Sequence, residues 1–468
     1  MLNGLEATEV KLSDLDLGDR LDAEYVSKES LLISKRLHER PTRKLGELGK
    51  FAVSAFYPAA THLYAEGDVP FMRCVDCINH PVISRSQDES FERIPSSFLA
   101  EHSSIDTVGK GDLIITKVGS PCYASIVHEH DELALSRTVM GLKGIAGINP
   151  YYLLAFLRSY YGFNQLLRQR ELTIQYQLTV ERVKDVDIFL PTIEFQSIIE
   201  SIVKAAHQKL EQSKSLYAEA ESLLLDELGL KDWQPSDENT AVKSFTESLG
   251  STGRIDAEYY QPRYQKAMSI LNRSGKRIGD VATLAKDRFT PTGLDSFNYI
   301  EIGNLSGDGS AEAEKILIED TPSRAQWIVK TNDVITSTVR PIRRLSALIE
   351  ADQNGFVCSS GFAVLRPKAI KPELLLVFLR APIVCEILDL HTTASMYPAI
   401  STEDLLQIPI TSPSETISNQ IVQRVRKSRS VKRESKRLLN IARRGVEIAI
   451  EKDEQTALKW IEKNQSKG

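Results

Sequence analysis

The feature that most constrains this chain is an internal duplication. Residues 20–26 read Arg-Leu-Asp-Ala-Glu-Tyr-Val and residues 254–260 read Arg-Ile-Asp-Ala-Glu-Tyr-Tyr, a separation of 254 − 20 = 234 positions. Residues 149–158 and 371–380, which both end in Phe-Leu-Arg, match at 371 − 149 = 222, so the second copy is 234 − 222 = 12 residues shorter. A period this long, present twice, is unlike a solenoid, whose repeats span roughly 20 to 50 residues. The sequence therefore predicts two similar domains related by a pseudo-two-fold axis.

Each copy combines strand and helix patterns. Runs of β-type residues bounded by turn residues lie at 69–75, 112–118 and 137–142 in the first copy, and at 299–302, 333–339 and 361–365 in the second. Pro150 and Pro372 open apolar segments, which suits proline in the first turn of a helix. We expect each copy to be a mixed α+β domain.

A long helical pattern follows each copy. Apolar and small residues fall on one stripe from Ile199 to Leu224, and again from Ile421 to Ala449. Each helix would run about 35 residues, or about 50 Å. The first is mainly acidic and the second mainly basic, which favours pairing of the two helices with each other. The alternative is that each helix is solvated and packs only on its own domain.

These patterns divide the chain into six segments. We expect a first domain over residues 1–193, a long helix over 194–230, a linker over 231–252, a second domain over 253–413, a second long helix over 414–455 and a tail over 456–468. The linker is assigned because residues 231–240 are polar and include a proline.

Composition sets limits on the environment of the protein. The chain has 468 residues, a formal net charge of −5 and five cysteines. The first residues have no basic stretch leading into an apolar run, and eighteen apolar residues never occur together. We therefore expect a cytoplasmic protein with reduced thiols and no contact with a membrane. The net charge does not indicate nucleic acid, but a basic surface can be hidden within such an average.

Common enzyme motifs are missing from the sequence. There is no GxxxxGK[ST] loop, HExxH, GxSxG or GxGxxG after a strand. Residues 149–152, Asn-Pro-Tyr-Tyr, approach the Asn-Pro-Pro-aromatic signature of adenine methyltransferases, but the second proline and a glycine-rich cofactor loop are absent. A helix start explains the proline, so we expect no catalytic residue and no cofactor on this chain.

One group of residues has the spacing of zinc ligands. It comprises Cys74, Cys77, His80, Cys122 and His128. In the second copy, Ile302 and Leu305 stand where Cys74 and Cys77 stand in the first. Apolar residues at the equivalent positions favour buried, inert thiols over a metal site.

Polar, basic and aromatic residues gather in the loops of both copies. The candidates for DNA contact are Lys50, Tyr57, Lys117, Ser120, Tyr123, Arg137, Gln175, Tyr176 and Gln177 in the first copy, and Lys286, Arg288, Arg340, Arg343, Arg344, Ser359, Ser360 and Tyr397 in the second. Arginine can bind guanine and glutamine can bind adenine, while lysine and serine meet phosphates. Residues 340–344 are the most distinctive group, because three neighbouring cations repel unless an anion is near. Arg340, Arg343 and Arg344 follow the strand at 333–339, so we expect them to project together from one end of the second domain. For any single candidate, the alternative is an ordinary solvated side chain.

The order of these features resembles a type I restriction-modification specificity subunit. The resemblance is carried by the repeated Asp-Ala-Glu-Tyr opening, the strands at 111–116 and 332–336, the segment 173–180 before Pro191, and the long helix after each domain. It implies two target-recognition domains separated by two antiparallel helices, each domain reading one half of a split site in double-stranded DNA. It also implies that this subunit is not catalytic.

The resemblance implies partners that supply the chemistry. Two methyltransferase subunits using S-adenosylmethionine would dock on this chain, and restriction subunits driven by ATP and magnesium would join them. The copies differ where residues 175–177 read Gln-Tyr-Gln and residues 396–399 read Met-Tyr-Pro-Ala, which fits unequal half-sites. The alternative function is a twin-domain scaffold that binds protein or RNA. A methyltransferase is disfavoured by the missing cofactor loop.

Overall fold

The computed structural model describes residues 25–55, 61–64, 67–171, 176–231, 233, 238, 240–253, 255, 257, 259–393 and 396–466. Tyr57, Gln175 and most of the two opening motifs lie outside these residues. The chain forms two compact units: unit 1 comprises residues 1–211 and 432–468, and unit 2 comprises residues 212–431. Each unit therefore contains one domain and one part of each long helix, α7 (Ile193–Leu228) and α14 (Glu415–Glu451).

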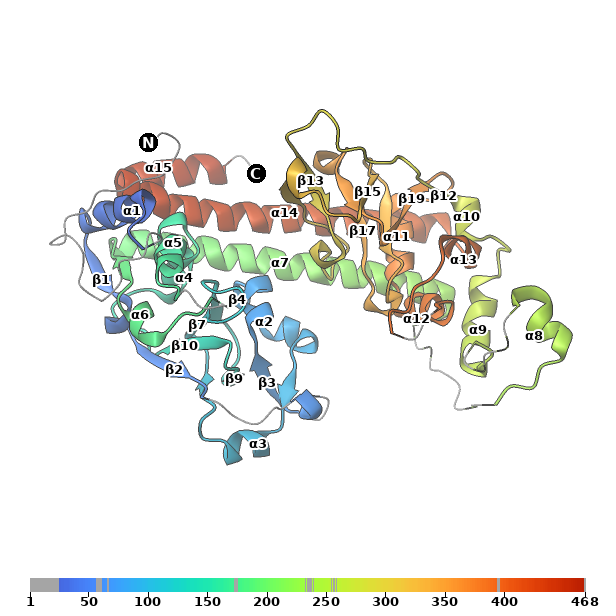
Figure 1. Cartoon of the computed structure of the whole chain (residues 1–468), viewed down its shortest axis with the longest axis horizontal. Helices are drawn as coiled ribbons and strands as arrows, with labels where there is room; N and C mark the ends of the chain where they lie inside the picture. The colour runs from blue at the N-terminus through green and yellow to red at the C-terminus, as the bar shows by residue number, and fades with distance from the viewer. Residues whose placement is uncertain are drawn as a thin grey trace. The chain divides into compact units, whose positions relative to one another are not determined.

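The domain of unit 1 is built on two sheets (Figure 1). One has the order β2-β10-β7-β8-β4, formed by Lys50–Val53, Val139–Lys143, Leu113–Thr116, Ala124–Val127 and Val82–Ile83. The other has the order β5-β3-β9-β6, formed by Arg93–Ile94, Val69–Met72, Leu133–Leu135 and Thr107–Val108. A small sheet pairs β1 (Thr42–Lys44) with β11 (Asp187–Phe189). The helices are α1 (Lys28–His38), α2 (Cys74–Asn79), α3 (Ser96–Glu101), α4 (Pro150–Leu157), α5 (Tyr160–Arg168) and α6 (Val180–Lys184).

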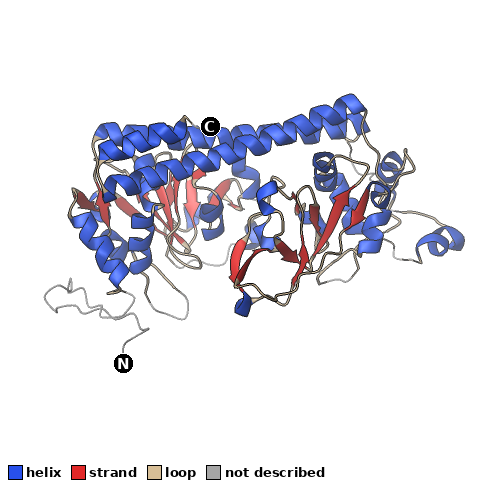
Figure 2. Ribbon diagram, turned by 90° about the horizontal axis from the view of Figure 1, so that it is seen from above, coloured by secondary structure: helices blue, strands red, loops and turns tan. Residues whose placement is uncertain are grey.

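The domain of unit 2 also has two sheets. Their orders are β12-β19-β16-β17 and β14-β13-β18-β15. The strands of the first are Ala282–Leu284, Phe362–Pro367, Val334–Ser337 and Ser346–Leu348, and those of the second are Glu314–Leu317, Ser296–Ile300, Val357–Ser359 and Ala325–Ile328. The helices are α8 (Phe245–Thr252), α9 (Pro262–Leu271), α10 (Ile278–Val281), α11 (Pro372–Arg380), α12 (Pro382–Leu390) and α13 (Thr402–Gln407). Figure 2 shows helices and strands together in both units.

The two domains share their topology except for β4, which extends the first sheet of unit 1 and has no counterpart among the described strands of unit 2. Strands β2, β10, β7 and β8 of unit 1 correspond in order to β12, β19, β16 and β17 of unit 2, and each neighbouring pair is antiparallel. In the second sheets, β3 runs parallel to β9 as β13 runs parallel to β18. Helices α4 and α11 begin at Pro150 and Pro372, as the sequence predicts. The α+β class and the duplication are therefore confirmed.

Backbone conformation repeats as well as topology. The central hairpin is formed by β7 and β8 in unit 1 and by β16 and β17 in unit 2. Three positions around it have positive φ in both units: Gly111 and Asn332, Gly119 and Arg340, Cys122 and Arg344. Residues other than glycine adopt this left-handed region at a cost. The shared backbone was therefore kept even where the side chains changed completely.

The long helices pair antiparallel within each unit. In unit 1 the hydroxyl of Ser435 donates to the carbonyl of Ala206 at 2.6 Å. In unit 2 the hydroxyl of Ser428 donates to the carbonyl of Ser213 at 2.7 Å. The small side chains at these positions allow the two backbones to approach closely. The helices also bury apolar residues against the domains, for example Ile199 in unit 1 and Ile421 in unit 2.

Charged residues of the long helices form ion pairs with each other and with the domains. One ion pair does join the helices in unit 2, between Arg424 and Glu219 at 3.2 Å. By contrast, Arg429 pairs with Glu350 of the domain at 2.7 Å. Small residues, apolar burial and the interhelical ion pair all contribute to the packing of the two helices.

Two segments have more structure than expected. Helix α8 lies inside the predicted linker, where Ser244 and Glu247 form a capping box that starts a helix. Helix α15 (Glu454–Gln465) occupies the predicted tail and buries Ala457 and Ile461 against the core of unit 1. Among the described residues, no helix combines the length and apolar character needed to cross a membrane.

The cysteines of unit 1 are mostly buried. Burial raises the pKa of Cys77 and of Cys122 to about 12, so both thiols are protonated at neutral pH. Cys74 is only half-buried, and its Sγ lies 3.3 Å from the carbonyl of Ser120. No group of three or more possible metal ligands occurs in the described part of the chain.

Candidate nucleic-acid interface

Three of the predicted contact residues meet in one hollow of unit 1. Lys50, Lys117 and Gln177 line a hollow of about 590 Å³, together with Lys184 and Glu181 of α6. The three lysines give this surface a positive charge that Glu181 only partly offsets. We name this group the lysine hollow. Cations and an amide in one concave surface suit a phosphate backbone and a base edge.

The backbone of the domain holds these residues together. Lys50 begins β2 and Lys117 follows β7, and a β-bridge joins Val118 to Gln177. A methyl group on Gly46 would lie 2.8 Å from the Cβ of Lys184, so glycine is needed for α6 to approach this closely. Sequence reasoning missed Lys184, because no motif surrounds it and Leu406 takes its place in the second copy.

The other predicted residues of unit 1 lie around the same hairpin. Ser120 and Arg137 are exposed, and Tyr123 is half-buried with its ring 5.7 Å from that of Phe163. Tyr176 is 40% exposed, and the guanidinium of Arg170 lies 4.2 Å from the centre of its ring. Arg137, Ser120 and Tyr176 are therefore open to a ligand, whereas Tyr123 partly faces the core.

In unit 2, Arg340 joins two loops. Its amide donates to the carbonyl of Pro398 at 2.8 Å, and its guanidinium lies 5.3 Å from the centre of the Tyr397 ring. Arg343 is exposed on the short helical turn Pro341–Arg343, and Tyr397 is 65% exposed. This loop pair, residues 340–344 and 396–399, corresponds to the Val118 and Gln177 region of unit 1, because Val339 bridges Ala399 in the same way.

The prediction that Arg340, Arg343 and Arg344 project together is wrong for Arg344. Its guanidinium pairs with Glu221 of α7 and donates to the carbonyl of Arg380 at 2.7 Å. Burial raises the pKa of Glu221 above its ordinary value, while the Arg344 guanidinium acts to lower it. The anion near Arg344 is thus a carboxylate of the protein, and Arg344 anchors the turn to α7.

The remaining candidates of unit 2 divide by exposure. Lys286, Arg288 and Ser360 are exposed, and Arg288 lies 5.7 Å from the centre of the Trp327 ring. Ser359 is only 1% exposed, because it ends a strand in the middle of a sheet. Ser359 is therefore too buried to contact DNA directly, and its prediction as a contact residue is wrong.

A pair of equivalent arginines was missed as a structural element. The Arg158 guanidinium donates to the carbonyl of Ala124 at 2.6 Å and of Cys77 at 2.9 Å. Arg380, which is 2% exposed, donates to the carbonyls of Arg344 at 2.7 Å and of Gly307. Burial of the Arg158 guanidinium lowers its pKa to about 10. The repeated Phe-Leu-Arg in the sequence was the available signal for this pair. Each arginine joins the central hairpin to the segment after β3 in unit 1 or after β13 in unit 2.

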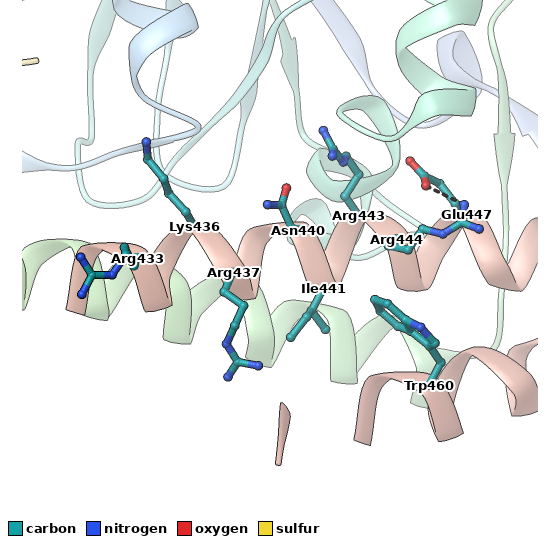
Figure 3. Close-up of a pocket in the computed structure, with 9 residues that line it drawn as sticks. All are labelled: Arg433, Lys436, Arg437, Asn440, Ile441, Arg443, Arg444, Glu447 and Trp460. Atoms are coloured by element: carbon teal, nitrogen blue, oxygen red, sulfur yellow. Dashed lines mark hydrogen bonds and ion pairs between the residues drawn. The ribbon is translucent and has the colours of Figure 1, made fainter. Parts of the chain in front are cut away.

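A second basic surface lies on the long helix of unit 1 (Figure 3). A groove of about 560 Å³ is lined by Arg433, Lys436, Arg443 and Arg444 of α14 and by Trp460 of α15. Arg444 pairs with Glu447 at 3.0 Å, so part of this charge is neutralised within the chain. Figure 3 shows Lys436 and Arg443 pointing to one side of α14, away from Trp460. We name this surface the α14–α15 groove.

Comparison with known proteins returns few matches in sequence. No family model matches the chain. The specificity subunit of the type I restriction enzyme HindI from Haemophilus influenzae is 21% identical over 149 residues, which is 31% of this chain and 32% of that protein. The alignment therefore spans about a third of the length of this relative.

Two solved structures cover most of the chain. The type I restriction-modification S subunit from M. genitalium is 12% identical, with a TM-score of 0.37, and covers 86% of this chain and 93% of its own. The HsdS subunit from Thermoanaerobacter tengcongensis is 16% identical, with a TM-score of 0.26, and covers 89% and 96%. The resemblance to specificity subunits that the sequence motifs indicate is thus confirmed by the curated relative.

Proposed function

We propose that this chain is the DNA-specificity subunit of a type I restriction-modification system and that it recognises a bipartite site. One observation carries the proposal: two domains share a backbone but place different cations at the ends of their central hairpins. A shared frame with different contact residues is what reading two unequal half-sites requires. Its similarity to the HindI subunit supports the same function.

Binding to duplex DNA is the first test. The chain, assembled with its methyltransferase partner, should protect two short stretches of a duplex separated by an unprotected spacer in a footprinting experiment. A duplex with either half-site scrambled should compete more weakly, since each mismatched base pair costs about 1–3 kcal/mol. A single continuous footprint would contradict the bipartite reading.

The chemistry is proposed to belong to partner subunits. We propose that methyltransferase subunits supply S-adenosylmethionine, and that restriction subunits supply ATP hydrolysis with magnesium. The purified chain should neither methylate nor cleave DNA. Binding of S-adenosylmethionine by the isolated chain, measured by calorimetry, would contradict this assignment.

We further propose that the long helices set the spacing of the half-sites. Helices α7 and α14 each contribute to both units, so their length couples one unit to the other. Inserting one helical turn into both should lengthen the unread spacer and leave the recognised letters unchanged, as half-site spacing mirrors protein geometry in other DNA-binding proteins. Changed letters with an unchanged spacer would refute this role.

The α14–α15 groove is our candidate for contact with a partner subunit. Arginine and tryptophan are enriched at the energetic centres of protein interfaces, and both line this groove. Replacing Arg443 or Trp460 with alanine should weaken assembly with the methyltransferase without changing the recognised letters. Leu32→Ala is a suitable control, because Leu32 is 52% exposed and does not line the groove.

The alternative is a scaffold that binds protein or RNA. The lysine hollow favours a phosphate backbone but does not by itself distinguish DNA from RNA. Competition between a duplex DNA, a duplex RNA and a single-stranded RNA of the same sequence separates these outcomes. Preference for RNA would support the alternative function.

A further inference from the structure

Three exposed apolar side chains stand on the loop pair of unit 2. Ile342 is 48% exposed, Met396 is 75% exposed and Tyr397 is 65% exposed. They lie beside Arg340, which contacts both loops, and beside the exposed Arg343. Single exposed apolar side chains are ordinary on a protein surface, but a group of them beside exposed cations is a candidate contact surface.

The two loops are held in place rather than loosely attached. The Arg340 guanidinium lies over the Tyr397 ring and donates to the carbonyl of Met396 at 3.4 Å. Val339 bridges Ala399, and the turn is fixed at its far end by the ion pair of Arg344. One face of the Tyr397 ring is therefore in contact with Arg340. The side chains of Ile342 and Met396 are exposed on loops whose backbone is held by these contacts.

Unit 1 has no counterpart of this arrangement in its hairpin. Between the left-handed positions Gly119 and Cys122 it carries Ser120 and Pro121, one residue fewer than unit 2 carries between Arg340 and Arg344. The extra residue of unit 2 is accommodated in a turn that includes Ile342 and Arg343. Ile342 thus stands on an addition to the shared frame, whereas the position equivalent to Met396 in unit 1 lies outside the described residues.

We propose that Ile342 and Met396 form a wedge that enters the base stack of the second half-site. This inference rests on the proposed DNA-binding function and adds a way of reading sequence. Proteins that insert isoleucine or methionine between base pairs unstack one step and bend the duplex, and the bend brings more of the protein surface into contact with the DNA. Arg340 and Arg343 stand beside the wedge, where they would neutralise the phosphates brought close by the bend.

The wedge implies indirect readout at one step. Pyrimidine–purine steps unstack and kink most readily, so the second half-site should favour such a step at the insertion point. The long, unbranched side chain of methionine suits insertion into an irregular gap. Unit 1, with the lysine hollow, should leave its half-site stacked.

The test uses the full chain assembled with its methyltransferase and a duplex that carries the recognised site. 2-Aminopurine is placed in turn at each position of both half-sites, and its fluorescence reports unstacking. We expect a rise at one step of the second half-site and a bend of roughly 20–90° in gel permutation analysis. Both should be lost in the Ile342→Ala, Met396→Ala double variant.

The matched control is the Leu294→Ala, Leu317→Ala double variant. These leucines are 51% and 49% exposed in the same unit, outside the loop pair. The control should keep both the fluorescence rise and the bend. A rise that persists unchanged in the wedge variant belongs to the partner enzyme and overturns the wedge.

Other outcomes separate the wedge from the proposed function. A wild-type complex that binds its site and unstacks only the base that the methyltransferase acts on would refute the wedge and leave the proposed DNA recognition intact. If the complex binds no duplex, the proposed function fails and the wedge fails with it. If the wedge variant instead loses assembly with the methyltransferase, the apolar side chains face a protein and the inference is overturned.

Discussion

Units 1 and 2 show how one backbone can carry two different contact surfaces. The carbonyl of Lys117 accepts from the amide of Leu178, and the carbonyl of Thr338 accepts from the amide of Ile400, so Lys117 and Thr338 are equivalent. Likewise Gly46 faces Lys184 as Gly279 faces Leu406. Two lysines of the hollow in unit 1, Lys117 and Lys184, are thus replaced by the neutral residues Thr338 and Leu406 in unit 2.

At the central hairpin, neutral residues of unit 1 are replaced by arginines in unit 2. Glycine and cysteine occupy the left-handed positions of unit 1, where unit 2 has Arg340 and Arg344. The buried arginines, by contrast, are the same in both units. The comparison teaches that the frame is largely constant while the partly or fully exposed cations around the hairpin differ, with Lys117 in unit 1 and Arg340 and Arg343 in unit 2, which suits two unequal half-sites.

The largest expected effect is on the free energy of unfolding and concerns Arg158 and Arg380, the arginines that the two units share. Replacing Arg380 with alanine removes a charged donor from the carbonyls of Arg344 and Gly307, and replacing Arg158 removes one from the carbonyls of Ala124 and Cys77. A hydrogen bond to a charged group contributes about 1.5–3 kcal/mol, so each variant, which loses more than one, should show a comparable loss of free energy of unfolding in urea. Arg343→Ala, at an exposed position, is the control and should leave the midpoint unchanged. A large loss in only one of the two arginine variants would break the equivalence.

The next effect separates two neighbouring arginines. Arg344→Ala should destabilise the protein by about 1–3 kcal/mol, because Glu221 is left buried without its cation. Arg343→Ala should instead weaken DNA binding and lower the salt slope by about one. Thermal unfolding and binding titrations at several salt concentrations distinguish these results. Equal effects of the two variants on stability would contradict the inward position of Arg344.

The pH dependence sharpens this contrast. Burial raises the pKa of Glu221 in the folded state above its ordinary value of 4.5, so the folded protein holds this proton more tightly than the unfolded chain. Stability from this group is therefore full below pH 4.5 and falls as the pH rises through the folded pKa. Without Arg344 the pKa of Glu221 should rise further, and the loss of stability on raising the pH should be larger than in the wild type.

The smallest effect is a change of charge in the hollow. The Lys117→Ala, Lys184→Ala double variant should weaken binding to all sequences alike and lower the salt slope by about two, since each phosphate contact contributes about 0.9. Thr338→Ala, at the equivalent position of unit 2, should leave the slope unchanged. An unchanged slope in the lysine variant would show that the hollow does not face the DNA backbone.

The sequence predicted the features that the two copies share. The duplicated Phe-Leu-Arg and the proline-initiated helices follow from local patterns, and the structure confirms the matching topology. What the sequence could not show is which side chains turn inward: Arg344 meets Glu221, far away in the chain, and Ser359 is buried by strands on both sides. Lys184 escaped because its position depends on contact between α6 and Gly46 rather than on any motif.

The account's central claim is that each unit reads its own half of a split site. The most direct measurement is sequencing of modified bases in a strain that carries this chain and its methyltransferase, with the wild type and with the Lys117→Ala, Gln177→Ala variant. The account predicts a bipartite motif in the wild type, and a variant motif that is relaxed in one half only, with the other half and the spacer unchanged. A motif without a spacer, or a variant that alters both halves together, would contradict it.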